Sequence, residues 1–221
     1  MYNAEADNYN TDRKQIIYKQ ETITIKTINK QHINRKQLQY RQIMRICIFC
    51  SANSDIDPDF FTATEELGRW AGACGHTIVF GGCDMGLMEC IGRTARGSGA
   101  HTVGVVPTKV EERGRTSRHI DVHIPCDNLS DRKDLMVTQS DVFIALPGGI
   151  GTLDEIFTVA AAGTIGYHSK RVILYNIKGF WNSLIAMLDD LQGRGFIRGN
   201  WRERIRVAEN IEEIRNLLSE E

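Results

Sequence analysis

Long hydrophobic runs, proline and net charge are all scarce in this sequence of 221 residues. No apolar run approaches the roughly 18 residues that a membrane span needs, so a membrane partner is not expected. The formal net charge is only -1, which excludes the basic field that drives nonspecific binding to nucleic acid. With 42% hydrophobic and 25% charged residues, the composition also excludes a wholly disordered, collagenous or coiled-coil chain. We expect a folded protein with neither nucleic acid nor membrane as its partner.

Glycine and proline are absent from the first 43 residues, although the whole chain has twenty glycines and four prolines. This segment carries a net charge of +4, which leaves -5 for the remainder. Its short alternations, as in residues 22–28, resemble strands, but no turn residues separate them and no second face closes a core. We interpret residues 1–43 as a disordered extension, with a translation start at Met44 as the alternative. Residues 44–221 are predicted to form a single domain.

Paired cysteine motifs are missing, apart from a single Cys47-x-x-Cys50 spacing among six cysteines. A zinc site usually needs a second such pair, and the other four cysteines form none. Both residues also fall within a predicted strand, where positions three apart point to opposite faces of the sheet. We therefore predict buried free thiols and no metal. Because the chain also lacks the apolar core of a secretory signal, we expect a reducing cytoplasm.

Strand-like apolar runs alternate with amphipathic helical patterns from residue 45 onward. The predicted strands are 45–50, 76–80, 102–106, 119–124, 141–146, 171–175 and 205–207. The predicted helices are 59–73, 86–96, 129–139, 153–162, 181–191 and 211–218, and residues 108–118 are predicted to form a mobile loop. Apolar strands separated by helices require a parallel sheet that is covered on both faces. The predicted fold is α/β, a Rossmann-like doubly wound domain.

Two strand-to-helix turns of this predicted sheet are rich in glycine, at the edge where such sheets bind ligands. The first contains Gly81, Gly82 and Gly86, and the second contains Gly148, Gly149, Gly151 and Thr152. Glycine lets a backbone approach a ligand closely, and the free N–H groups of the helix that follows favour an anion. Neither loop has the P-loop or the GxGxxG pattern. The two loops predict a phosphate site, with a simple tight turn as the alternative for each.

A basic pair, Arg132 and Lys133, lies near the start of the predicted helix 129–139, which Ser130 or Asp131 is suited to cap. A guanidinium fork fits an anionic phosphate or a ribose edge. The alternative is an ordinary solvated pair of surface charges.

These motifs together resemble one family. Residues 147–155 match PGGxGTxxE, and Arg132-Lys133-x-x-Met136 lies upstream at the spacing of the LOG (LONELY GUY) family. Its members resemble cytokinin riboside 5′-monophosphate phosphoribohydrolases and have often been labelled lysine decarboxylases. The resemblance runs from residue 46 to about residue 182. It implies hydrolysis of the N-glycosidic bond of a nucleoside 5′-monophosphate, such as AMP or an N6-modified, cytokinin-type nucleotide. It also implies a homodimer, and no cofactor is expected.

The resemblance also implies roles for individual residues. Breaking the N-glycosidic bond develops positive charge on the ribose, so a carboxylate beside the sugar is useful, and Glu155 is the candidate. A carboxylate that only complements the helix dipole is the alternative. Arg132 would counter charge on the leaving base or the phosphate. The implied substrate-binding set comprises Lys133, Gly148, Gly149, Gly151, Thr152, Asp154, Gly81, Gly82, Gly86 and Met88.

Some positions depart from the family pattern. Cys83 and Glu89 stand where glycine is common, and Ser130 stands where histidine is common. Residues 108–118, which in the family contribute near the base, show little likeness. The rival function is a noncatalytic nucleotide binder or a carrier of molybdenum cofactor, but the presence of both Arg132 and Glu155 favours the enzyme. Nothing in the sequence indicates the Schiff-base lysine that a pyridoxal phosphate decarboxylase needs.

Overall fold

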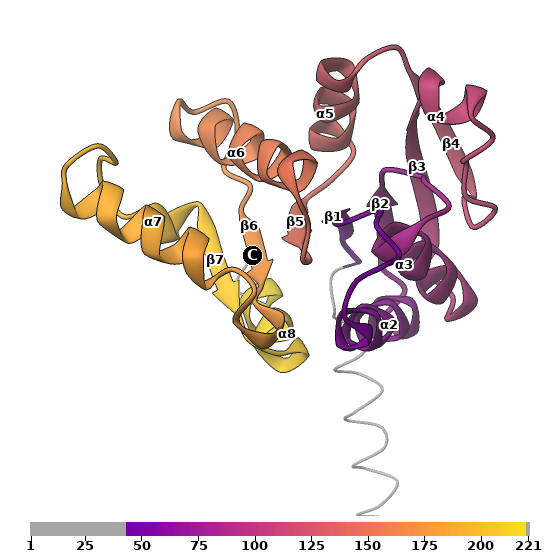
Figure 1. The fold of residues 1–221 in the computed structure, drawn as a ribbon, viewed down its shortest axis with the longest axis horizontal. Coiled ribbons are helices and arrows are strands. Elements are labelled where there is room, and N and C mark those ends of the chain that lie inside the picture. The colour runs from indigo at the N-terminus through magenta and orange to yellow at the C-terminus, as the bar shows by residue number, and fades with distance from the viewer. Residues whose placement is uncertain (1–42, 220–221) are drawn as a thin grey trace, which may run out of the picture. The chain divides into compact units, whose positions relative to one another are not determined.

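The computed structural model describes residues 43–219. These residues form a seven-stranded parallel sheet with helices packed against it (Figure 1). The strands are β1 Arg45–Phe49, β2 Thr77–Phe80, β3 His101–Pro107, β4 Val122–Cys126, β5 Val142–Ala145, β6 Val172–Tyr175 and β7 Ile205–Ala208. Their order in the sheet is β4-β3-β2-β1-β5-β6-β7, and every neighbouring pair is parallel. The predicted extension, apart from residue 43, lies outside the described residues.

Helices cover both faces of this sheet, as Figure 1 shows. The helices are α2 Pro58–Ala73, α3 Gly86–Gly97, α4 Thr108–Glu112, α5 Leu129–Thr138, α6 Ile150–Thr164, α7 Asn182–Gly193 and α8 Ile211–Leu218. Helices α2, α3 and α8 bury side chains in the core on one face, and α5, α6 and α7 do so on the other. Alternate residues of the central strands β1, β2, β5 and β6 enter opposite cores, because a strand points successive side chains to opposite faces. The doubly wound α/β fold is confirmed.

The two cores show where the cysteines lie, which tests the prediction of buried free thiols. Cys47 lies in the core under α5, α6 and α7, whereas Cys50 lies in the core under α2, α3 and α8. All six cysteines are free, and Cys74 and Cys83 are half-buried rather than buried as predicted. Among residues 43–219, no group of three or more His, Cys, Asp or Glu side chains is placed to hold a metal ion. Nor is any described helix long and apolar enough to cross a membrane.

Three local predictions were wrong. Residues 108–118 form the short helix α4 and then turn back, with Gly114 at a φ of +63°. Strand β4 begins at Val122 rather than at residue 119, because the Asp121 carboxylate accepts hydrogen bonds from the backbone N–H and the hydroxyl of Thr102, each at 2.9 Å. Helix α5 is capped by Asn128, whose Oδ1 accepts from two backbone N–H groups at 2.9 and 3.0 Å.

Helices α2 and α3 pack closely because α2 presents glycine to α3. A Cβ at Gly68 would lie 3.0 Å from the Thr94 Cβ, and a Cβ at Gly72 would lie 2.6 Å from the backbone carbon of Ser98. Backbone atoms cannot move aside as the end of a flexible side chain does. The contact therefore depends on the absence of a side chain at Gly72.

We expect Gly72→Ala to lower the free energy of unfolding by about 1–3 kcal/mol, because the added methyl group overpacks the contact between α2 and α3. Urea denaturation measures this. The matched control is Gly97→Ala in α3, where a Cβ meets no atom within 4 Å. That variant should gain up to about 1 kcal/mol from the better helix propensity of alanine. A Gly72→Ala protein as stable as the control would contradict the packing argument.

Candidate active site

The two glycine loops meet at the carboxyl ends of β2 and β5, on either side of β1. This is the point where the chain switches from one face of the sheet to the other, and ligands of open α/β sheets bind there. Ser51, two residues beyond the end of β1, joins both loops through its backbone. The Ser51 N–H donates to the Pro147 carbonyl at 3.1 Å, and the Ser51 carbonyl accepts from the Leu87 N–H at 3.0 Å. Ser51 was not among the predicted site residues, although its place just after the first strand was the available signal.

The backbone N–H groups of the first glycine loop are largely occupied within the chain. The Gly86 N–H donates to the Ser54 hydroxyl at 3.2 Å, and the Asp84 N–H donates to the Arg115 carbonyl at 2.9 Å. Gly86 has a φ of +56°, and a Cβ there would lie 2.5 Å from the backbone carbon of Ala52. Glycine is therefore required at Gly86 by the turn, which supports the tight-turn interpretation of this loop.

Gly81 has a different role, because the Arg132 side chain lies directly on it. A Cβ at Gly81 would be 1.8 Å from Nη2 of Arg132 and 2.8 Å from Sδ of Met88. The bare Cα of this glycine thus provides the space that the guanidinium occupies. Three residues of the predicted site, from the loop after β2, from α3 and from α5, meet at this contact.

The second glycine loop leads into the N terminus of α6, where no side chain caps the helix. Its N-cap is Gly149, and the first N–H groups of a helix have no acceptor within the helix itself. A Cβ at Gly149 or Gly151 would meet nothing within 4 Å, so this helix end is open. Thr152 is buried, and its Oγ1 lies 2.1 Å from where a Gly148 Cβ would be. Gly148 therefore makes room for the Thr152 side chain, and the open helix end suits an anion.

Glu155 lies one turn further along α6 and faces Arg132. Nη1 of Arg132 is 3.5 Å from Oε1 of Glu155, and the two side chains are only 14% and 10% exposed. Burial raises the pKa of Glu155 from 4.5 to about 7, against the opposing effect of the Arg132 charge. Nε of Arg132 is buried without a hydrogen-bond partner among residues 43–219. The pair therefore combines a carboxyl group that titrates near neutral pH with a cation that has an unused donor.

A second ion pair lies next to the first between the same two helices. Nζ of Lys133 is 2.8 Å from both carboxylate oxygens of Asp154. The Lys133 side chain is 19% exposed and that of Asp154 is 49% exposed. Lys133 and Asp154, both predicted to bind substrate, are therefore bound to each other here. Their pairing joins α5 to α6 and so helps to hold Arg132 opposite Glu155.

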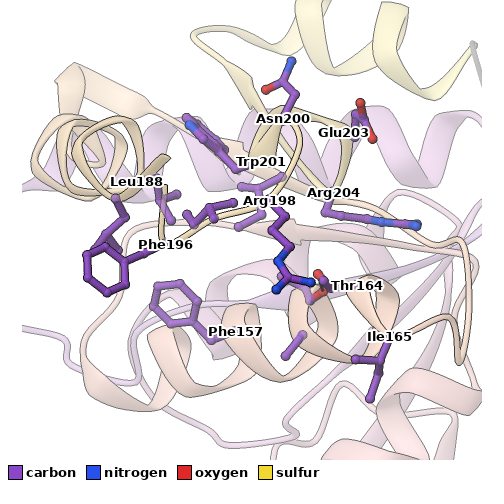
Figure 2. A pocket seen from close by; sticks show the side chains of 15 residues that line it. Phe157, Thr164, Ile165, Leu188, Phe196, Arg198, Asn200, Trp201, Glu203 and Arg204 are labelled. Atoms are coloured by element: carbon purple, nitrogen blue, oxygen red, sulfur yellow. Dashed lines mark hydrogen bonds between the residues drawn. The ribbon is translucent and has the colours of Figure 1, made fainter. Parts of the chain in front are cut away.

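A large hollow lies elsewhere, beside the other end of α6 (Figure 2). It has a volume of about 690 Å³ and is lined mainly by apolar side chains of α6, α7 and the segment before β7, among them Phe157, Leu188 and Phe196. Apolar pockets are the usual ligand sites of proteins. Arg198 and Arg204 line it, but it contains neither Glu155 nor Arg132, and it adjoins the C-terminal end of α6 rather than an open helix N terminus. The glycine loops are therefore the better candidate for an anionic substrate.

Comparison with known proteins identifies the family of this chain. Residues 88–218 match a family model described as "Possible lysine decarboxylase". The cytokinin riboside 5′-monophosphate phosphoribohydrolase LOG4 of Arabidopsis thaliana is 32% identical over 188 residues, which cover 85% of this chain and 87% of that protein. The chain belongs to the LOG family.

Solved structures similar to this LOG-family chain share its fold. The X-ray structure of TM1055 has a TM-score of 0.64 and 24% identity, over 81% of this chain and 100% of that chain. The Moco carrier protein from Chlamydomonas reinhardtii has a TM-score of 0.60 and 22% identity, over 81% of this chain and 100% of that one. At such identities the likeness carries the α/β architecture and not the function.

The raised pKa of Glu155 in this LOG-family chain predicts a pH-dependent stability. Between pH 4.5 and 7 the unfolded chain has released the Glu155 proton while the folded chain retains it, so stability falls as the pH rises through this window. The loss is at most about 3 kcal/mol. Glu155→Gln removes the titration. We therefore expect the stability of the wild type relative to Glu155→Gln to fall between pH 5 and pH 8 in urea denaturation, and parallel curves would contradict the buried carboxyl.

Proposed function

We propose that this LOG-family chain hydrolyses the N-glycosidic bond of a nucleoside 5′-monophosphate, releasing the base and ribose 5-phosphate. The observation that carries the proposal is the position of the buried Glu155 carboxyl. It lies one turn from the uncapped end of α6 and 3.5 Å from the Arg132 guanidinium. A phosphate group and a ribose can therefore be bound by one short segment. The names of the relatives, which act on a riboside 5′-monophosphate, support this substrate class.

The phosphate is proposed to bind the open N terminus of α6. The backbone N–H groups at residues 150–152 lack acceptors within the helix and lie at the positive end of its dipole, where a phosphate is stabilised. The Thr152 hydroxyl, beside Gly148, offers a further donor. Gly149 and Gly151 leave the approach to these groups open.

Glu155 is proposed to act on the ribose. As the bond between C1′ and the base nitrogen breaks, its electron pair leaves with the base and positive charge develops on the ribose ring. The ionised carboxylate of Glu155 stabilises this charge, and it also suits binding a ribose hydroxyl or positioning the water. The water oxygen then bonds to C1′, and one of its protons balances the charge of the departing base. Arg132, whose Nε donor is unused, is placed to counter negative charge on the base or phosphate.

We expect the purified protein to release free base from AMP, from an N6-modified AMP, or from both, as measured by chromatography. Glu155→Ala should lower kcat by about 100-fold or more, because the charge on the ribose then has no buried counterion. The matched control is Glu66→Gln, an exposed carboxylate on α2, on the opposite face of the sheet. That variant should keep full activity.

Unchanged turnover in Glu155→Ala would remove the proposed mechanism. No release from any nucleoside monophosphate by the wild type, together with tight binding of a nucleotide or of molybdenum cofactor, would favour the carrier function instead.

We also propose that the chain forms a homodimer in a reducing cytoplasm. The six free cysteines suit that compartment. Exposed apolar side chains near the hollow of Figure 2, including Ile165 at 72% and Phe196 at 72%, suit a contact between two copies beside the ends of α6 and α7.

Light scattering should therefore give about twice the 25.0 kDa mass of one chain. Phe196→Glu should shift the mass toward the monomer, because a charge would be desolvated at the contact. A monomeric wild type would contradict the dimer and leave the proposed chemistry intact.

A further inference from the structure

The segment Arg115–Ser117 is bound to the first glycine loop as a short antiparallel strip. Thr116 forms an isolated antiparallel bridge with Cys83. On either side of this bridge, the Asp84 N–H donates to the Arg115 carbonyl at 2.9 Å and the Ser117 N–H donates to the Gly82 carbonyl at 2.8 Å. The strip therefore occupies the Asp84 N–H and the Gly82 carbonyl, so that a ligand cannot bind these two backbone groups.

Glu89, in the first turn of α3, binds the end of this strip. The Ser117 hydroxyl donates to Oε2 of Glu89 at 2.5 Å, and Nε2 of His119 lies 3.4 Å from Oε1 of Glu89. The His119 backbone N–H in turn donates to the Ser117 hydroxyl at 3.1 Å. Ser117 is only 5% exposed. One carboxylate thus contacts both polar side chains at the end of the strip, in a half-buried environment that strengthens such contacts.

These contacts continue into the candidate site. The Gly82 carbonyl that Ser117 holds belongs to the residue directly after Gly81, on which the Arg132 guanidinium lies. Met88, the residue before Glu89, places its Sδ against the same glycine. The strip therefore lies next to the ribose-binding part of the candidate site, within two residues of the glycine beneath Arg132.

The strip lies where the base of the proposed substrate would reach. The phosphate is assigned to α6, which follows β5, and the first glycine loop follows β2. These strands are separated only by β1, so their ends are about 10 Å apart. A nucleoside monophosphate with its phosphate on α6 and its ribose at Glu155 and Arg132 extends across this interval. Its base then lies toward the first glycine loop and the strip.

We propose that Glu89 is a positioning residue for base recognition, which acts through Ser117 and His119 to fix the Arg115–Ser117 strip as the wall of the base site. This inference rests on the proposed function for the direction in which the nucleotide lies. It assigns a role to Glu89, which stands at a position where the family pattern commonly has glycine. The resemblance to the family already implies that residues 108–118 lie near the base, and the proposal adds the residues that hold this segment in place.

The test compares a ligand that has a base with one that lacks it. Glu89→Ala and Ser117→Ala should each raise the KM for AMP about tenfold, the cost of losing a hydrogen bond to a charged group. The inhibition constant of ribose 5-phosphate should stay unchanged, and kcat should change much less than KM. Glu89→Gln keeps an acceptor for the Ser117 hydroxyl and should partly restore the KM. The effect of the double variant should be much smaller than the sum of the two single effects, because both substitutions remove the contact between Glu89 and Ser117.

The matched control is Glu65→Ala, which removes a carboxylate that joins α2 to Arg93 of α3, away from the strip. Its KM for AMP should equal that of the wild type. An unchanged KM in Glu89→Ala, or an equal weakening of AMP and ribose 5-phosphate, would overturn the inference. If the wild type binds AMP without cleaving it, the proposed hydrolysis fails. The dissociation constants of AMP and ribose 5-phosphate then test this inference: weaker binding of AMP alone in Glu89→Ala supports it, and equal weakening of both ligands overturns it. If it binds neither ligand, both proposals fall.

Discussion

The contact between the Arg132 guanidinium and the bare Cα of Gly81 is the constraint around which the candidate site is arranged. It fixes the position of the buried Arg132 guanidinium, and the charge of Arg132 favours the ionised form of the Glu155 carboxyl. An unpaired charge at this depth would be costly, and the 3.5 Å separation from Glu155 offsets part of that cost. The fold supplies the partners from three sources: a loop after β2, the first turn of α5 and the second turn of α6. None of them is adjacent in the sequence.

The environment of Glu155 involves a balance between stability and reactivity. Desolvation raises its pKa toward neutrality, which destabilises the ionised form in the folded state, while Arg132 and Lys133 favour that form. A carboxyl poised in this way changes its charge readily when a substrate displaces water or brings a phosphate nearby. The Lys133–Asp154 pair shows how the balance is maintained, because it holds α5 and α6 together without adding a free charge to the site.

The sequence was sufficient for the doubly wound sheet, because each buried strand is a continuous apolar run and each helix has an apolar stripe that is readable locally. It also located the two loops, because the carboxyl ends of parallel strands share one edge, whereas the roles predicted for Arg132 and Glu155 came from the resemblance to the LOG family. It did not reveal α4, and it could not reveal the strip that follows, because Arg115 and Ser117 are held by hydrogen bonds to Asp84 and Gly82, more than thirty positions away. The cap of α5 was missed for a related reason. Several adjacent residues had suitable side chains, and only the backbone path selects Asn128.

The two glycine loops differ in one respect that limits what the site can accept. In the first loop, the N–H groups of Cys83, Asp84, Gly86 and Leu87 already have acceptors within the chain. In the second, the start of α6 has no side-chain cap. Of these two loops, the second therefore has the more open helix start. An anion that enters the site is expected to bind at the start of α6 rather than at the first glycine loop.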